Sequence, residues 1–181
     1  MDTITRETSI EELASILSRY LEKAGILATL SGGGAVSIYT HNDYQSYDLD
    51  FVTSASRKEL RDALAPIGFQ ESSNLRQFEH PHTEWFVEFP PSPLGFGDLI
   101  IDHKDIPIFN TKHGPLRVIT PTLSVIDRLA AYWYHYDPQC WDQAIKVCQN
   151  RIVDWQMIYD WAANEGQSKQ SIDSLRAKSE G

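Results

Sequence analysis

Two short stretches of the sequence combine residue types that suit phosphate and metal chemistry. Three consecutive glycines, Gly32, Gly33 and Gly34, follow one apolar run, while Asp48 and Asp50 lie in the next, separated by one leucine. A glycine backbone can approach a ligand closely because it has no side chain, and the amides at the start of a helix attract phosphate. Together the two stretches predict a place for a nucleotide.

The paired aspartates suit a divalent cation. Side chains alternate between the two faces of a strand, so Asp48 and Asp50 are expected on one face while Leu49 and Phe51 point into the core. Carboxylates about 7 Å apart repel each other, and a cation removes that cost. Mg²⁺ prefers a few carboxylates together with substrate phosphates. The alternative is that Asp48 only caps the strand and Asp50 faces water.

The elements that must position these residues alternate between strand and helix. Ser9 and Ser56 each begin a capping-box pattern, with a glutamate three residues later, which predicts that a helix starts after each serine. The elements expected in this half of the chain are helices over residues 10–24 and 57–65, strands over 26–30 and 48–53, and a short helix over 35–39.

The second half changes from strands to helices at Thr120, a good N-cap that is followed by proline. Strands are expected over residues 69–78, 83–89, 106–109 and 116–119, and helices over 121–136, 140–147 and 152–163. We therefore expect an α/β (α+β) fold, a mixed sheet flanked by helices. The predicted units are an α/β domain at residues 1–119, a helical region at 120–164 and a frayed tail at 165–181.

Composition limits the classes of function. The 181 residues carry a formal net charge of −9, which disfavours a general nucleic-acid surface because phosphate contacts need clustered lysine and arginine. No apolar run approaches the roughly 20 residues that span a bilayer, and the first residues do not resemble a signal peptide. A cytoplasmic protein without membrane contact is therefore expected.

The glycine turn and the paired acids resemble the signature of the nucleotidyltransferase superfamily, typified by DNA polymerase beta and by AbiEii-like toxins of type IV toxin–antitoxin systems. The matching stretches are LSGGGA at residues 30–35 and DLDF at residues 48–51. The resemblance implies a nucleotidyltransferase-like fold, one or two Mg²⁺ ions and a nucleoside triphosphate as substrate. It also implies that Ser31 and the glycine amides hold the β and γ phosphates.

The same resemblance implies a third acid on a later strand. Glu88 is the best match, since it interrupts the apolar stretch of residues 85–91. Glu84 is its nearest competitor, while Asp98 and Asp102 fit a strand position less well. Glu88 would join Asp48 and Asp50 as metal ligand and catalytic residue, unless it is only an exposed residue of an edge strand.

The likeness continues into the helical half. Residues 119–121 and 127–131 resemble the start of that half in the toxin-like members, which often carry a lysine there. Arg128 is expected to take the role of that lysine and contact the triphosphate. The alternative for Arg128 is a surface ion pair in the neighbourhood of Asp127.

Three functions remain open at this point. The first is Mg²⁺-dependent transfer of a nucleotide to an acceptor hydroxyl, of RNA or of a protein side chain if the protein is toxin-like; the charge does not indicate RNA. The second is a catalytically inactive relative that binds a protein partner through its aromatic C-terminal helices, favoured by Tyr44, where many relatives have a basic residue. The third is a metal-dependent phosphohydrolase that uses the same acids.

Overall fold

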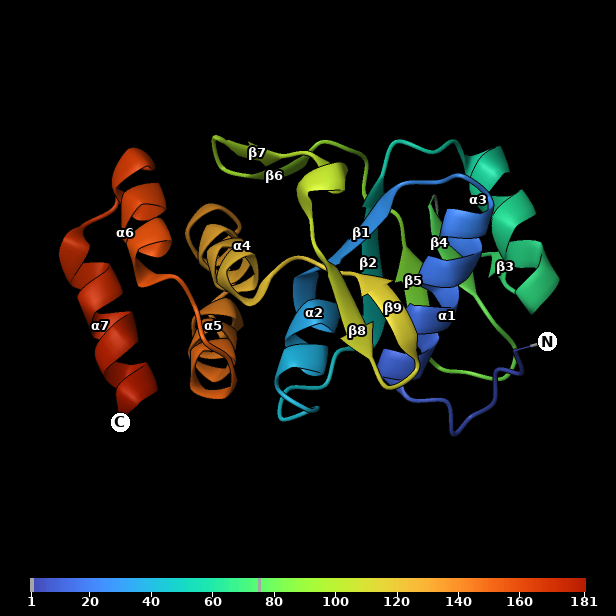
Figure 1. Cartoon of the computed structure of the whole chain (residues 1–181), viewed down its shortest axis with the longest axis horizontal. Helices are drawn as coiled ribbons and strands as arrows, with labels where there is room; N and C mark the ends of the chain where they lie inside the picture. Colours follow the sequence, from blue (N-terminus) through green and yellow to red (C-terminus); the bar gives the residue numbers. More distant parts are fainter. Residues whose placement is uncertain (1, 75) are drawn as a thin grey trace.

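The computed structural model describes residues 2–74 and 76–181, and these form a mixed sheet with helices around it (Figure 1). The helices are α1 (Ile10–Lys23), α2 (Gly32–Tyr39), α3 (Arg57–Leu64), α4 (Pro121–Tyr134), α5 (Gln139–Asn150), α6 (Trp155–Asn164) and α7 (Lys169–Glu180). The strands are β1 (Ala28–Ser31), β2 (Asp48–Thr53), β3 (Gln70–Glu71), β4 (Gln77–Glu79), β5 (Phe86–Glu88), β6 (Leu94–Phe96), β7 (Leu99–Ile101), β8 (Ile108–Thr111) and β9 (Gly114–Arg117).

The main sheet has five strands in the order β1-β2-β5-β4-β3. β2 and β5 are parallel, while the other neighbouring pairs are antiparallel. The expected α/β fold with a mixed sheet is therefore confirmed. Where one strand was expected over residues 69–78, the chain forms the two short strands β3 and β4, because polar residues of turn type lie between them.

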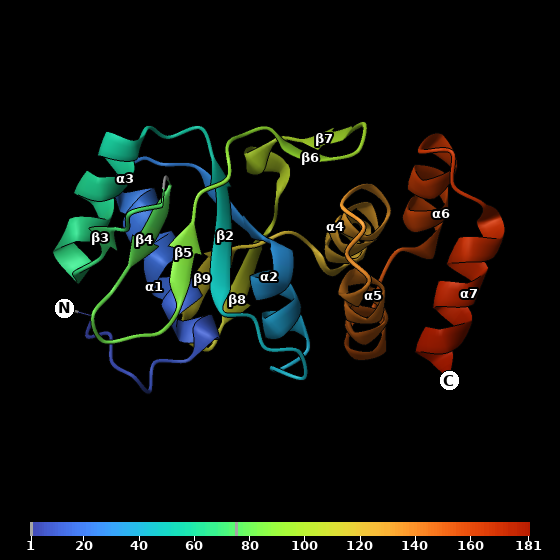
Figure 2. The same ribbon diagram turned by 180° about the vertical axis from the view of Figure 1, so that it is seen from behind.

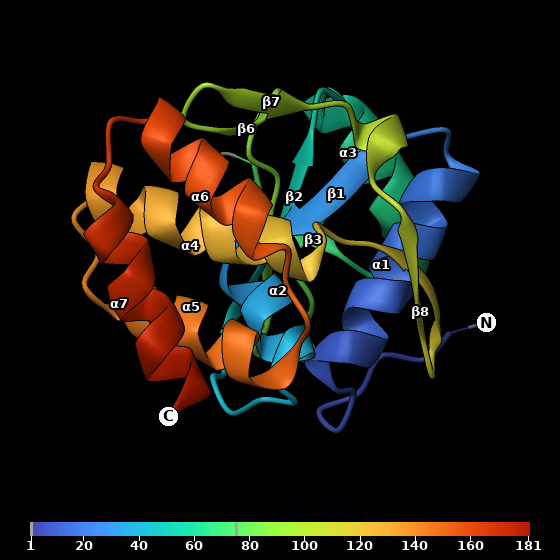
Figure 3. The same cartoon turned by 60° about the vertical axis from the view of Figure 1, so that its left-hand side comes forward.

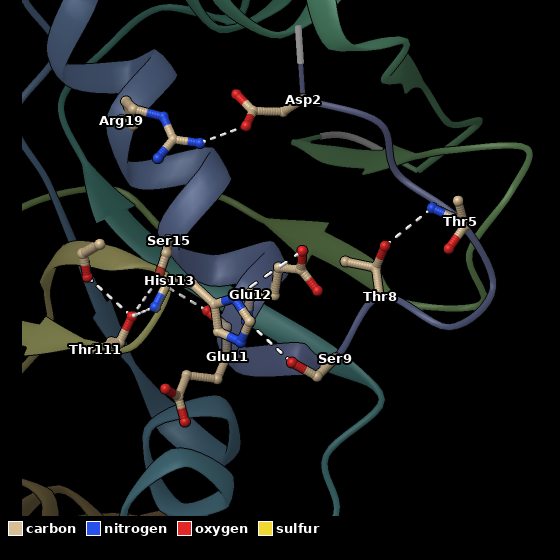
Figure 4. Close-up of polar contacts among 11 residues, drawn as sticks. Asp2, Thr5, Thr8, Ser9, Glu11, Glu12, Ser15, Arg19, Thr111 and His113 are labelled. Atoms are coloured by element: carbon tan, nitrogen blue, oxygen red, sulfur yellow. Dashed lines mark hydrogen bonds and ion pairs between the residues drawn. The ribbon is translucent and has the colours of Figure 1, made fainter.

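The ends of the helices follow the predicted capping residues. The Ser9 side chain accepts a hydrogen bond from the Glu12 amide at 3.2 Å, and Ser56 forms a complete capping box with Glu59. Figure 4 shows the first of these caps, together with the hydroxyls of Ser15 and Thr111, which lie 2.9 Å apart and join α1 to β8. Caps of this kind satisfy amides that have no partner within the helix.

Helices cover one face of the sheet. α1 packs against α2 and α3, and Figure 2 shows β2 and β5 in front of α1 when the molecule is seen from behind. Leu49 and Phe51 of β2 are fully buried, whereas Asp48 and Asp50 are half-buried. The predicted alternation along β2 is confirmed, and the two aspartates belong to the face that α1 does not cover.

The C-terminal helices extend the molecule away from the sheet. α6 packs on α4 and α7 packs on α5, as Figure 3 shows. The frayed tail expected from residue 165 onward was wrong, because α7 is capped by Ser168 and buries Ile172 and Leu175 completely. The division of the chain into domains stays a prediction. Within the described residues, no helix is long and apolar enough to span a bilayer.

Candidate active site

Strand pairing brings three carboxylates together on the sheet face that α1 leaves uncovered. β2 and β5 run in parallel, with Asp50 opposite Glu88 and Asp48 opposite Phe86. Each of the three acids offers one oxygen atom, and these oxygens all lie within 4.8 Å of one another. Among residues 2–74 and 76–181, this is the one group of three acids, histidines or cysteines close enough to share a metal ion.

The third acid of the group is Glu88 rather than its competitors Glu84, Asp98 and Asp102. Glu88 is half-buried and lies on β5, the central strand of the sheet, with β2 on one side and β4 on the other. The alternative of an exposed residue on an edge strand is therefore wrong. Its role in catalysis stays a prediction, but its position beside Asp50 is a property of the fold.

The electrostatics of the group are those of crowded acids. Burial, and then the charges of Asp48, Glu88 and Asp127, raise the pKa of the Asp50 carboxyl to about 7, while Arg128 opposes them. Burial and the charge of Asp48 also raise the pKa of Glu88. A divalent cation between these oxygens would relieve the repulsion. Carboxylate oxygens are hard ligands of the kind that Mg²⁺ prefers.

Asp48 is held by a serine that the sequence patterns did not single out. Ser46 is buried, and its hydroxyl lies 2.9 Å from Asp48 Oδ1 and 3.0 Å from the Asp48 carbonyl oxygen. This contact fixes the side chain at the first position of β2. Serine side chains often form hydrogen bonds with groups two residues further along the chain. The position of Ser46 two residues before Asp48 is therefore a sequence signal for this contact.

The glycine turn lies against the acids. α2 begins at Gly32, three residues earlier than expected, and Gly32 has a φ of +65°. A Cβ atom at Gly32 would lie 2.5 Å from Asp50 Oδ2, and one at Gly34 would lie 2.8 Å from a methyl group of Leu49. The glycines therefore allow the start of α2 to pack closely on β2, and the expected close approach of their backbone to a ligand stays a prediction.

The first amide of α2 already has a partner within the chain. The Gly32 N–H donates to Asp127 Oδ2 at 3.1 Å, although the two residues are 95 positions apart. The same oxygen accepts from Arg128 Nη2 at 2.8 Å. The sequence predicts Asp127 only as part of the ion-pair neighbourhood of Arg128, and no local pattern indicates a contact at this range.

Arg128 lies near the acids and is firmly held. Besides Asp127, its guanidinium contacts Gln143 Oε1 at 3.1 Å and Cys140 Sγ at 3.5 Å, both on α5. Its side chain is only 13% exposed, so the ion pair with Asp127 is largely buried and not on the surface. Whether Arg128 contacts a triphosphate stays a prediction.

Two further residues of interest surround the glycine turn. Ser31 is buried, and its hydroxyl donates to the Asp50 carbonyl oxygen at 3.5 Å, so it faces the backbone of β2. The ring of Tyr44 would lie 3.3 Å from a Cβ atom at Gly33. Burial raises the pKa of Tyr44, and Arg128 opposes that effect. A phosphate-binding role for Ser31 and the glycine amides stays a prediction.

The aromatic residues of the C-terminal helices pack within the molecule. The rings of Trp133 and Trp161 are stacked with their centroids 5.8 Å apart. Trp161 also donates its indole N–H to the Phe96 carbonyl oxygen at 2.9 Å. These contacts give the rings a structural use, and binding of a protein partner through these helices stays a prediction.

Hollows of different character occur around the molecule. One of about 640 Å³ lies between α6 and α7, and one of about 480 Å³ lies between α6 and the β6–β7 hairpin. None of the three acids lines either of them. A smaller hollow of about 320 Å³ includes Glu88 in its wall. The smaller hollow is therefore connected to the candidate site.

No protein-family model matches the sequence, and no curated protein matches it either. Several solved structures share the fold. An antigenic nucleotidyltransferase-like protein from Paracoccidioides brasiliensis is 14% identical with a TM-score of 0.59, over 94% of this chain and 93% of that one. The lincosamide antibiotic adenylyltransferase LnuA, solved with lincomycin, is 16% identical with a TM-score of 0.53, over 77% of this chain and 96% of that one.

A third similar structure is ANT(2″)-Ia in complex with adenylyl-2″-tobramycin. It is 13% identical with a TM-score of 0.50, over 94% of this chain and 96% of that one. At such low identity the likeness concerns the fold. The expected nucleotidyltransferase-like fold is therefore confirmed, whereas activity and substrates must be argued from the site itself.

Proposed function

We propose that this protein is a metal-dependent nucleotidyltransferase, which transfers a nucleotide from a nucleoside triphosphate to an acceptor hydroxyl and releases pyrophosphate. The observation that carries the proposal is the convergence of Asp48, Asp50 and Glu88 within 4.8 Å, next to the N-terminus of α2. Acids and helix amides placed side by side are the parts that phosphoryl transfer uses. The shared fold of the adenylyltransferases supports the same reaction class.

Asp48, Asp50 and Glu88 would hold one or two Mg²⁺ ions. The fit rests on the donor set, which consists of carboxylate oxygens only, and on the raised pKa values of Asp50 and Glu88, which burial and then the neighbouring acids cause. Bound Mg²⁺ would supply charge neutralisation of the phosphates and a lower pKa for the attacking hydroxyl. Ser46 would keep Asp48 oriented toward the site.

Nucleotide phosphates would bind at the glycine turn, with contacts from Ser31, the amides of Gly32, Gly33 and Gly34, and Arg128. The Asp127 carboxylate accepts hydrogen bonds from both the Gly32 amide and Arg128 Nη2. Like Asp127 Oδ2, a phosphate oxygen carries negative charge and can accept both hydrogen bonds. Binding would therefore exchange the Asp127 carboxylate for a phosphate oxygen.

Glu88 suits the acceptor side of the reaction. The strand order places it on β5, while the glycine turn follows β1 on the other side of β2. Because burial and Asp48 raise its pKa, Glu88 is a better proton acceptor than an ordinary surface glutamate. It would accept the proton of the attacking hydroxyl.

Isothermal titration with ATP, GTP, CTP and UTP in the presence of Mg²⁺ tests the proposal. The wild type should bind at least one of them, and the Asp48→Asn plus Asp50→Asn double variant should lose that binding. A matched control is Asp142→Asn plus Asp160→Asn, which removes two exposed aspartates from α5 and α6. If the wild type shows no Mg²⁺-dependent binding, the enzymatic proposal fails.

The second candidate function is a catalytically inactive protein that binds a partner. The occupied Gly32 amide favours it, as does Tyr44 beside the glycine turn. Under this alternative the double variant and the wild type behave alike toward nucleotides. A phosphohydrolase would instead release inorganic phosphate without any acceptor, and an assay that separates phosphate from pyrophosphate distinguishes the two reactions.

The resemblance to type IV toxins extends the proposal to a toxin-like role, with RNA or a protein side chain as acceptor. The net charge of −9 weighs against RNA. Induced expression in a bacterial host tests the role: the wild type should arrest growth and the Asp48→Asn plus Asp50→Asn variant should not. Equal growth of the two strains would contradict a toxin-like role and leave the transfer reaction open.

A further inference from the structure

The sheet face that carries the acids continues beyond Glu88 into the hollow of about 320 Å³. Its walls are formed by Asn74, Arg76, Gln77, Glu88, Phe89 and Pro90. Glu88 is thus shared between the acid cluster and the hollow. Gln77 lies opposite Glu88 in the register of β4 and β5, so the hollow begins directly beside the third carboxylate.

The hollow and the glycine turn lie on opposite sides of the acids. Along the sheet, β1 leads into the glycine turn, β2 carries Asp48 and Asp50, and β5 carries Glu88, followed by β4 with Gln77. Since nucleotide phosphates would bind at the glycine turn, the hollow is left for the second substrate. This step rests on the proposed function.

The walls of the hollow offer neutral hydrogen-bonding groups. Asn74 Nδ2 donates to Gln77 Oε1 at 2.7 Å, which fixes the two side chains relative to each other. Among the described residues, the Asn74 side-chain oxygen and the Gln77 side-chain nitrogen have no partner. One acceptor and one donor group are therefore available to a ligand.

Arg76 holds this side of the hollow in place. It has a φ of +62°, and a left-handed backbone is uncommon for residues other than glycine. Its guanidinium donates to the carbonyl oxygens of Phe89 and Thr53, which ties the start of β4 to the ends of β5 and β2. Among the described residues, the hydrogen bonds of Arg76 use Nε and Nη2, which leaves Nη1 to donate to a ligand.

We infer that the hollow beside Glu88 binds the acceptor, and that the acceptor is a hydroxylated ring of the sugar class. Neutral amides, a guanidinium and a carboxylate are groups that hydroxyls bind well. The volume of about 320 Å³ lies at the lower end of ligand pockets, which suits a single ring. Arg76 is the single cation in the wall, and one positive charge is too few to bind the phosphates of an RNA chain.

The reaction balances with the nucleoside triphosphate as co-reactant. The acceptor hydroxyl oxygen attacks the α-phosphorus, and a new phosphorus–oxygen bond forms. The bond between the α-phosphorus and the oxygen that leads to the β-phosphate breaks, and its electron pair leaves with pyrophosphate. The hydroxyl proton passes to the Glu88 carboxylate.

Proton–nitrogen NMR of the full chain tests the binding site directly, because the side-chain amides of Asn74 and Gln77 have their own signals. D-glucose, D-ribose and a short RNA with a free 3′ hydroxyl are titrated separately. Shifts of these two signals with a sugar support the inference. If neither sugar moves them, or if only the RNA does, the inference is overturned.

Pyrophosphate release adds a kinetic test. Gln77→Ala should raise the KM for the bound sugar about tenfold, equivalent to one lost hydrogen-bonding group, and leave the affinity for Mg²⁺–ATP unchanged. Gln70→Ala is the matched control, an exposed glutamine on the neighbouring strand β3. An unchanged sugar KM in Gln77→Ala contradicts the inference. Sugar-induced shifts without any Mg²⁺–ATP binding would contradict the proposed function only.

Discussion

Gly32 and Asp127 meet through a hydrogen bond of 3.1 Å that joins the first amide of α2 to the middle of α4. The bond links the turn expected to bind phosphate to the helix that carries Arg128, and it places an anionic group where a phosphate oxygen would bind. Asp127 also contributes to the raised pKa of Asp50. The Asp127 carboxylate therefore places a negative charge of the protein itself beside the glycine turn.

Asp127→Asn should bind Mg²⁺–ATP more tightly than the wild type. The asparagine oxygen can still accept from the Gly32 amide, but the competing negative charge is gone and Arg128 is released. We expect an affinity gain of about fivefold to tenfold, close to 1 kcal/mol, in isothermal titration. Asp142→Asn serves as control on α5. Weaker binding in Asp127→Asn would mean that the carboxylate positions Arg128 for the nucleotide.

The metal-free protein should lose stability as the pH rises from 5 to 8. The pKa of Asp50 is about 7 in the folded chain and about 4 in an unfolded one. Between these two pH values the folded state therefore keeps a proton on Asp50 that the unfolded state releases. The free energy of unfolding should fall by about 2 kcal/mol across this range. Urea denaturation in EDTA measures it.

Asp50→Asn is the variant that separates this effect from other titrations. It should show a flatter dependence of the free energy of unfolding on pH than the wild type, because the perturbed carboxyl is absent. Asp160→Asn, an exposed aspartate on α6, should keep the wild-type slope. Identical slopes for the wild type and Asp50→Asn would contradict the assignment of the pH dependence to Asp50.

Mg²⁺ should stabilise the protein more at pH 8 than at pH 6. At the lower pH, protons compete with the metal for Asp50 and Glu88, whose pKa values are both raised. A metal present at about 100 times its Kd adds roughly 2.7 kcal/mol to the free energy of unfolding. Thermal unfolding with and without Mg²⁺ at each pH gives the comparison, and an equal shift at both pH values would contradict it.

Gly32→Ala should damage both stability and metal binding, and Gly25→Ala provides a close control. Both glycines have a left-handed φ, +65° and +73°, but a Cβ atom at Gly25 meets nothing within 4 Å. We expect a loss of about 1 kcal/mol for Gly25→Ala, from backbone strain alone. Gly32→Ala should lose more, because Asp50 must move to avoid the new methyl group.

The measurements are urea denaturation and the Mg²⁺-dependent shift of the unfolding temperature. Gly25→Ala should keep the metal response of the wild type, while Gly32→Ala should lose most of it. If the two variants lose equal stability and both keep the metal response, the contact between the glycine turn and Asp50 does not contribute to metal binding.

Local patterns were enough to predict the parts that local chemistry determines. The helix caps at Ser9, Ser56 and Thr120 formed as expected, and β2 has the bounds that were predicted. Alternation of side chains along β2 placed Asp48 and Asp50 on one face, which depends on neighbours within a few residues. The third acid came from the family resemblance, which pointed to Glu88 in its apolar stretch.

The features that were missed depend on contacts distant in sequence. α7 has only two fully buried apolar residues, Ile172 and Leu175, so its helix is stabilised by packing on α5 and α6 and not by a strong pattern of its own. The β6–β7 hairpin lies in a segment of prolines and glycines that reads as a connection. The position of Asp127 follows from the fold of the whole chain.

Helix α4 gives the protein an optical reporter of its own. Asp127 touches the glycine turn, and Trp133, six residues further along the same helix, stacks on Trp161 of α6. A helix rises about 1.5 Å per residue, so the two residues are separated by roughly 9 Å along the axis of α4. A ligand that displaces the Asp127 carboxylate would shift α4 and change the stacking of Trp133 on Trp161. Intrinsic tryptophan fluorescence would then report ligand binding without an added dye.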